Sequence, residues 1–179
     1  MNDRYIIERE FEHAGCKCVV TFNNMGHRCG YVGIPSTHLL YGEDYGNYLD
    51  IKKEDIGDRE VSGVIPLMCD CLDNDERIKI GAYFQCHGGI TYSGGGKDSE
   101  YPIASDLWWF GFDCDHYGDG KDLQYAFEKF PKYRKEISLS MECERKFPIE
   151  GEIVRSKEYV ANECKRLAEQ LKEFETEVH

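Results

Sequence analysis

The sequence predicts an α+β protein, mainly an antiparallel sheet with a C-terminal amphipathic helix packed on one of its faces. Three observations lead to this class. Two runs of β-branched and aromatic residues, 17–22 and 27–35, flank an NNMG turn and indicate a hairpin. A third run, 107–114, has the strongest strand pattern in the chain. Apolar residues then recur at helical spacing over 156–178.

Length and composition indicate one domain over residues 1–179. A chain of 179 residues with 41% hydrophobic and 13% aromatic content can bury one compact core. Residues 36–60 are polar, rich in tyrosine and punctuated by glycine, so we expect a long irregular excursion there. The segment 130–155 receives no assignment from its sequence.

The remaining elements follow in chain order. Pro35 ends the first hairpin because proline cannot donate to a sheet ladder. VSGVIPL, 61–67, suggests a further strand, and IKIGAYFQC, 78–86, alternates in a way that predicts a strand with its odd and even positions on opposite faces. Residues 121–130 predict a short helix ended by proline, and Ser156 is the expected N-cap of the last helix.

The charge and the cysteines limit the classes of partner. The net charge of −12 makes extended nucleic acid and anionic membranes unsuitable partners. With no apolar run of membrane-spanning length and no signal-peptide core, we expect a cytoplasmic protein with reduced cysteines. The pairs Cys16/Cys18 and Cys69/Cys71 have one intervening residue, so buried thiols are favoured over a structural zinc.

The strand LWWFGFDC, 107–114, has two different faces. Trp108, Phe110, Phe112 and Cys114 point one way and suit the core. Trp109, Gly111 and Asp113 point the other way and combine an aromatic wall, a gap and a carboxylate, as a ligand pocket does. The alternative is that Trp109 packs beneath the 36–60 excursion. We favour the pocket wall.

The loop DCDHYGDG follows this strand and resembles a calcium loop only in part. Tyr117 stands where a fifth-position oxygen ligand is needed and Gln124 where a bidentate glutamate is needed. A looser divalent site from Asp113, Asp115, Asp119 and His116 is a hypothesis that we do not favour. The alternative is a solvated turn in which aspartates accept hydrogen bonds from local amides.

Two further positions carry polar chemistry. His87 precedes a double glycine, and with His116 it could supply an acid and a base. Arg28 lies between two glycines on the opposite strand face from Tyr31, where its guanidinium could pair with a phosphate or stack on a base. The default expectation is a structural hydrogen bond for each histidine and an acidic partner for Arg28.

Known catalytic fingerprints are missing from the sequence. GHRCGYVG does not open a helix as a dinucleotide-binding loop does, and GITYSGGG is not a nucleophile elbow. The strings GHRCGYVGIP, HGGITYS, WWFGFDCDHYGD and YVANECKRLAEQL instead resemble an uncharacterised family of small proteins common in bacteriophage genomes. That resemblance implies a phage protein in the host cytoplasm. By analogy of context, it suggests binding of nucleotides that host defences use as signals.

Three functions remain open. The first is sequestration of a small nucleotide-like ligand without turnover and without a cofactor, by Arg28, Tyr31, His87, Trp109, Asp113 and His116. The second is a metal-dependent hydrolase or phosphodiesterase that uses Asp113, Asp115, His116 and His87, with His87, His116 and Asp113 as the catalytic groups. The third is inhibition of a host enzyme through a protein interface, or self-association. We lean toward binding rather than catalysis.

Overall fold

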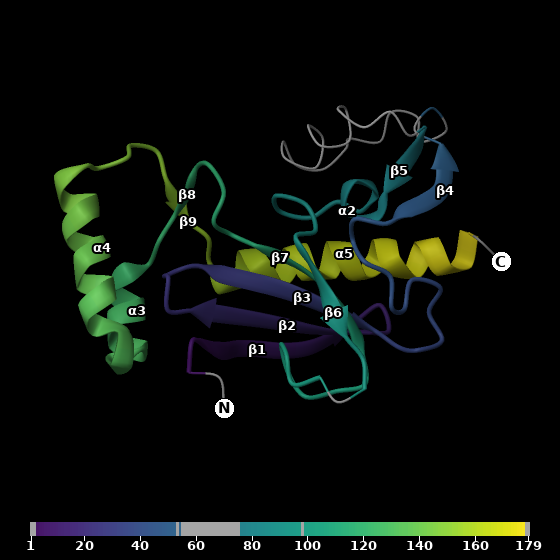
Figure 1. Cartoon of the computed structure of the whole chain (residues 1–179), viewed down its shortest axis with the longest axis horizontal. Helices are drawn as coiled ribbons and strands as arrows, with labels where there is room; N and C mark the ends of the chain where they lie inside the picture. The colour runs from purple at the N-terminus through teal and green to yellow at the C-terminus, as the bar shows by residue number, and fades with distance from the viewer. Residues whose placement is uncertain (1–2, 53, 55–75, 98, 178–179) are drawn as a thin grey trace.

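The computed structural model describes residues 3–52, 54, 76–97 and 99–177. In these residues a five-stranded sheet has the order β1-β2-β3-β7-β6, with every neighbouring pair antiparallel (Figure 1). Its strands are β1 (Tyr5–His13), β2 (Cys16–Asn23), β3 (Arg28–Ile34), β7 (Trp108–Asp113) and β6 (Tyr92–Gly95). The long helix α5 (Lys157–Glu177) crosses one face of this sheet, so the predicted α+β class is confirmed.

The predicted N-terminal hairpin is β2–β3, in register from Lys17↔Gly33 to Phe22↔Arg28. Its turn is closed by Asn23, whose Oδ1 accepts hydrogen bonds from the amides of Met25 and His27. The sequence did not predict the edge strand β1. Its side chains are half-buried or exposed and several are charged, so it lacks the apolar alternation that marks a buried face.

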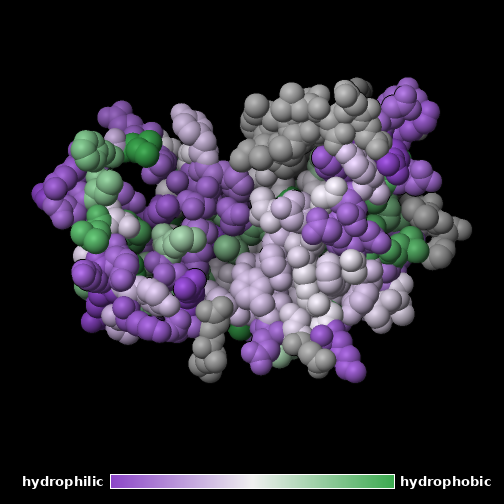
Figure 2. Space-filling view, in the orientation of Figure 1, coloured by the Kyte–Doolittle hydropathy of each residue, from purple (hydrophilic) through white to green (hydrophobic). Residues whose placement is uncertain are grey.

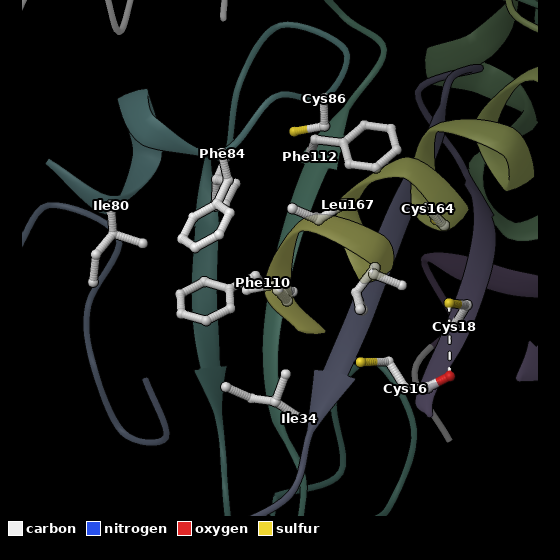
Figure 3. Close-up of a cluster of buried hydrophobic side chains, with 14 of the residues drawn as sticks. Cys16, Cys18, Ile34, Ile80, Phe84, Cys86, Phe110, Phe112, Cys164 and Leu167 are labelled. Carbon is white, nitrogen blue, oxygen red and sulfur yellow. Dashed lines mark hydrogen bonds between the residues drawn. The ribbon is translucent and has the colours of Figure 1, made fainter. Parts of the chain in front are cut away.

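The main core lies between the sheet and α5. Helix α5 begins as expected, with Ser156 Oγ accepting from the amide of Tyr159 at 3.1 Å. Leu167 of α5 belongs to the same buried cluster as Phe84 and Phe110, and Figure 3 shows the three side chains beside one another. Burial in this cluster raises the pKa of the Cys18 thiol to about 12, in keeping with an inert packing role.

The strand predicted over 78–86 is wrong for most of its length. β5 (Arg77–Lys79) covers only its beginning, and the four-residue helix α2 (Ile80–Tyr83) follows. The amides of Ile80 and Gly81 donate to the carbonyls of Asn47 and Tyr45 and not to a neighbouring strand. The alternating apolar residues of this segment are nevertheless all buried, because the segment packs with α5 and the sheet in the main core. They are Ile78, Ile80, Ala82, Phe84 and Cys86.

The segment after β7 builds a second, smaller unit at one end of the sheet. It contains β8 (Asp119–Gly120), α3 (Leu123–Lys129), a 3₁₀ turn (Pro131–Tyr133), α4 (Arg134–Lys146) and β9 (Ile153–Val154). α3 confirms the predicted helix, capped by Asp122, whose Oδ1 accepts from the amide of Tyr125 at 3.0 Å. β8 and β9 pair in parallel, and β9 leads directly into α5 (Figure 1).

The described part of the 36–60 excursion consists of turns and β4 (Tyr48–Lys52), which pairs with β5. His38 fixes it to the end of α5: its Nε2 lies 3.0 Å from the carbonyl of Leu171. The strand predicted at 61–67 and the pair Cys69/Cys71 lie outside the described residues.

Figure 2 shows hydrophobic residues gathered over α4 and the loop that follows it. Phe147 and Ile149 are 73% and 69% exposed in that loop, and Leu139 of α4 is 60% exposed. Among the described helices, none combines the length and apolar composition that crossing a membrane requires.

Candidate functional site

His87 lies in a loop that is fixed to α5. Cys86 and Ile90, which precede and follow His87 in the chain, are buried in the main core. On α5, Gln170 accepts from the amide of Gln85 and donates to its carbonyl, both at 2.7 Å. This pairing holds the backbone beside the helix, so the His87 ring points toward the first turn of α5, where its Nδ1 lies 3.0 Å from the hydroxyl of Tyr159.

His116 and Asp119 lie in the tight turn that follows β7. The amide of Asp119 donates to the carbonyl of His116 at 2.9 Å, and Gly118 adopts a φ of +89° that other residues rarely reach. Asp119 then begins β8, whose parallel pairing with β9 brings Arg155 alongside. The site is thus assembled from the β7–β8 turn, the loop after α2 and the start of α5.

Asp119 is the centre of this network. Its side chain is only 1% exposed and receives three hydrogen bonds. Nε2 of His87 lies 2.7 Å from Oδ2, the amide of His116 lies 3.1 Å from Oδ2, and Nε of Arg155 lies 2.7 Å from Oδ1. Burial opposes ionisation of this carboxyl group, but the hydrogen bonds from Arg155 and His87 outweigh it and lower its pKa below the usual value.

The network continues on both sides of Asp119. The Arg155 guanidinium lies over the ring of Tyr159, 4.9 Å from its centroid, and Tyr159 in turn meets His87. The four side chains Arg155, Asp119, His87 and Tyr159 therefore form a closed ring of contacts. Because a tyrosine hydroxyl can donate or accept, Tyr159 is compatible with either neutral tautomer of His87.

His116 is the one member with an unsatisfied nitrogen. Its Nδ1 is buried and has no hydrogen-bond partner among the described residues. The nearest acidic oxygens are Asp119 Oδ2 at 3.8 Å and Asp113 Oδ1 at 3.9 Å, both beyond hydrogen-bond range. The ring fits closely against Gly88, where a Cβ would lie 2.2 Å from its Cε1, so only glycine leaves room for it.

This geometry suits a divalent cation. The ligating atoms of His87, His116 and Asp119 lie within 4.8 Å of one another, and two imidazoles with one carboxylate are a donor set typical of zinc and non-haem iron. Asp113 adds a carboxylate beside His116. Of the four residues in the predicted divalent site, Asp115 is turned away, with its carboxylate 3.2 Å from Lys121 Nζ.

A pocket of about 640 Å³ opens beside the cluster. His116 and Asp119 line it from the turn, and α4 and its following loop contribute Ile137, Phe147 and Ile149. Its volume lies within the usual range for small-molecule sites. The combination of His116 and Asp119 on one side and apolar side chains on the other could hold a substrate against His116.

Two residues of the predicted nucleotide site are engaged elsewhere. Arg28 binds Glu8 through two nitrogens, at 2.6 and 3.1 Å, and donates to the carbonyl of Arg155 at 2.9 Å. Its guanidinium also lies over Phe22, 5.0 Å from the ring centroid. Arg28 thus joins β3 to β1 and to the residues just before α5. An acidic partner for Arg28 was the default expectation from the sequence.

Trp109 is fully buried. It lies on the sheet face opposite α5 in a cluster with Val19, Cys29 and Tyr31, covered by residues 101–107, and its Nε1 donates to Ser105 Oγ at 3.1 Å. Burial therefore supports a packed strand, although the cover comes from 101–107 and not from the 36–60 excursion. The gap at Gly111 is filled by the ring of Tyr31, which would lie 2.5 Å from a Cβ there.

The sequence indicated part of the cluster and missed the rest. The sequence indicated four candidates, because these titratable residues lie close to glycines in the chain: His87, His116, Asp113 and Asp119. Arg155 and Tyr159 were missed, since nothing near the N-cap Ser156 marks them as more than the first turn of an amphipathic helix. His27, whose Nδ1 is also buried without a partner among the described residues, was missed as well.

The fold and the cluster together define an α+β protein with a His–His–Asp site at the junction of a sheet turn and a long helix. No family model, curated protein or solved structure matches the chain.

Proposed function

We propose that this protein is a metal-dependent hydrolase whose divalent ion is held by His87, His116 and Asp119. One observation carries the proposal: Nδ1 of His116 is buried without a hydrogen-bond partner in the part of the chain that the structure describes, and two carboxylate oxygens lie 3.8 and 3.9 Å from it. Leaving a buried polar atom unpaired costs about 1–3 kcal/mol, so the arrangement calls for a bound group. A cation between the imidazole and the carboxylates would satisfy all of them.

The surrounding residues support this assignment. Tyr159 lies behind His87 and Arg155 behind Asp119, and partners of this kind orient metal ligands. A divalent ion held here would supply a nucleophilic water at neutral pH. Asp113, beside His116, would act as the proton acceptor, and the 640 Å³ pocket would hold the substrate.

Nucleotide sequestration receives less support from the geometry. That hypothesis depended most on Arg28 and Trp109. Arg28 is hydrogen-bonded to Glu8, and Trp109 is fully buried. The hydrolase proposal needs neither residue. It uses His87, His116 and Asp113, together with Asp119.

Calorimetric titration of the metal-free protein with Zn²⁺ and Mn²⁺ tests the ion site. We expect one ion per chain in the wild type and no binding by His116→Phe. This variant keeps a ring against Gly88 and removes Nδ1, which makes no hydrogen bond with any residue that the structure describes. His13→Phe is the matched control: His13 is paired with Glu169, ten residues further along α5 than Tyr159, or about 15 Å.

Hydrolysis is measured in parallel with p-nitrophenyl acetate and bis(p-nitrophenyl) phosphate. We expect turnover that requires added metal, is abolished by EDTA and is lost in His116→Phe. Absence of metal binding, or wild-type metal binding by His116→Phe, would overturn the site. Stoichiometric binding of a cyclic nucleotide or ADP-ribose that is recovered unchanged would favour sequestration instead.

A further inference from the structure

A second pocket, of about 370 Å³, lies on the sheet face opposite α5. His27 is in its wall, immediately before β3, and its side chain is only 5% exposed. Its Nδ1 is buried with no hydrogen-bond partner among the described residues. The nearest acidic oxygen is Asp115 Oδ2 at 3.6 Å, outside hydrogen-bond range.

The contacts of Asn23 determine which nitrogen of His27 carries the proton. Oδ1 of Asn23 accepts from the amides of Met25 at 3.0 Å and His27 at 3.3 Å. The amide nitrogen Nδ2 is therefore the atom that meets His27 Nε2 at 2.7 Å, and it can only donate. Nε2 must accept, so the neutral ring carries its proton on Nδ1. The pocket thus presents a buried N–H donor that has no acceptor within hydrogen-bond range among residues 3–52, 54, 76–97 and 99–177.

Two carboxylates line the same pocket but do not reach this donor. Asp113 and Asp115 present carboxylates to the same pocket, and Thr91 Oγ1 donates to Asp113 Oδ2 at 2.9 Å. Tyr92 supplies an aromatic side, braced edge-on against Tyr31 with ring centroids 5.6 Å apart. A ligand that matches this wall must accept one hydrogen bond from the imidazole and donate others to the carboxylates.

A hydroxyl group has this dual character, whereas a charged ligand does not. An anion would face two carboxylates, and the described residues that line the pocket include no lysine or arginine. They are Asn23, Met25, His27, Cys29, Tyr31, Thr91, Tyr92, Phe112, Asp113 and Asp115. A metal ion would meet the N–H of His27 instead of a lone pair. Neighbouring hydroxyls on a compact, neutral ring satisfy both requirements, and an aromatic side chain can pack on the ring's apolar face.

We propose that this pocket binds a neutral sugar-like polyol, with one hydroxyl accepting from His27 Nδ1 and donating to Asp115. The polyol could be a free monosaccharide or the ribose of an uncharged nucleoside, which share the same diol chemistry. This inference rests on a different histidine from the ion site, although Asp113 borders both sites and Asp115 lines both pockets.

Saturation-transfer NMR and calorimetry on the full chain in EDTA test the proposal without any contribution from metal. The probes are ribose, glucose, galactose, adenosine and AMP. We expect saturable one-to-one binding of at least one sugar or of adenosine, and weaker binding of AMP than of adenosine. Tighter binding of a free sugar than of adenosine identifies a monosaccharide site, and the reverse order identifies a nucleoside site.

Asp115→Asn is the decisive variant because Asp115 is exposed enough to be replaced without disturbing the core. We expect it to weaken binding at least tenfold, since it replaces a charged acceptor by a neutral one. Asp50→Asn, another exposed aspartate outside the residues of this pocket, should bind as the wild type does. Absence of binding to every sugar and to adenosine, wild-type affinity in Asp115→Asn, or tighter binding of AMP than of adenosine would overturn the proposal.

Discussion

His87 Nε2 and Asp119 Oδ2 lie 2.7 Å apart although 32 residues separate them in the chain. The contact joins the loop after α2 to the turn after β7, and Arg155 and Tyr159 extend it to the start of α5. One buried carboxylate thus joins three segments of the chain. The proposed ion site and the packing of this corner of the molecule involve the same side chain.

Replacing that carboxylate should therefore affect stability as well as metal binding. Asp119→Ala leaves the guanidinium of Arg155 and the ring of His87 without their partner. Because the Asp119 side chain is 1% exposed, we expect a loss of about 3 kcal/mol in the free energy of unfolding. Urea denaturation measures it. Asp122→Ala, which removes the N-cap of α3, is the comparison variant, since losing a cap costs only about 1 kcal/mol. Equal losses for the two variants would contradict a central role for Asp119.

Gly88 should be intolerant of any side chain. It adopts a φ of +67°, and a Cβ there would come within 2.2 Å of the His116 ring. We expect Gly88→Ala to lower the unfolding free energy by about 1–3 kcal/mol and to displace His116. Thermal unfolding and the imidazole NMR signals of His116 report the two effects. Gly42→Ala is the control, because Gly42 also has a positive φ, +85°, but open space around it. A similar response at both glycines would show that backbone strain alone matters.

Arg28 should contribute to stability and not to ligand binding. Both members of the Arg28–Glu8 pair are nearly buried, at 11% and 8% exposed, and Arg28 also stacks on Phe22. We expect Arg28→Ala to cost about 3 kcal/mol by leaving Glu8 unpaired, whereas Arg145→Ala on the exposed surface of α4 should cost little. Chemical denaturation measures both. An Arg28 variant of normal stability that loses ligand binding would restore the nucleotide-site hypothesis.

His27 should make the protein less stable in mild acid. Burial lowers its pKa below the usual 6.5, while the charges of Asp115, Asp113 and Asp119 act in the opposite direction and Lys121 acts with burial. Below pH 6.5 the unfolded chain therefore binds a proton that the folded chain does not. The contribution of His27 is complete above pH 6.5 and declines as the pH falls through the folded-state pKa.

The measurement is the unfolding free energy of the wild type and of His27→Gln between pH 7.5 and 5. We expect a shallower decline in the variant, because glutamine does not titrate. Identical slopes in the wild type and His27→Gln would show that the His27 ring titrates alike in the folded and unfolded states.

The sequence alone determined the elements with the strongest local signals. The strands β2, β3 and β7 are dense in β-branched and aromatic residues, in keeping with cores on both faces of the sheet, and α5 carries apolar residues at helical spacing after an N-cap. Edge strand β1 escaped prediction because its faces are less distinct, and residues 80–83 became a helix because the loop at Tyr45 and Asn47 supplied their hydrogen-bond partners.

The sequence also placed His87, His116, Asp113 and Asp119 among the candidates, but only the tertiary structure decided how they are used. The partner of Arg28, the burial of Trp109 and the participation of Arg155 and Tyr159 depend on segments tens of residues apart. The periodicity of a segment indicates which of its side chains are buried, but it does not indicate which distant side chain will contact that segment. The physical reason is that a hydrogen bond or a packed ring requires a partner whose position is set by the fold as a whole.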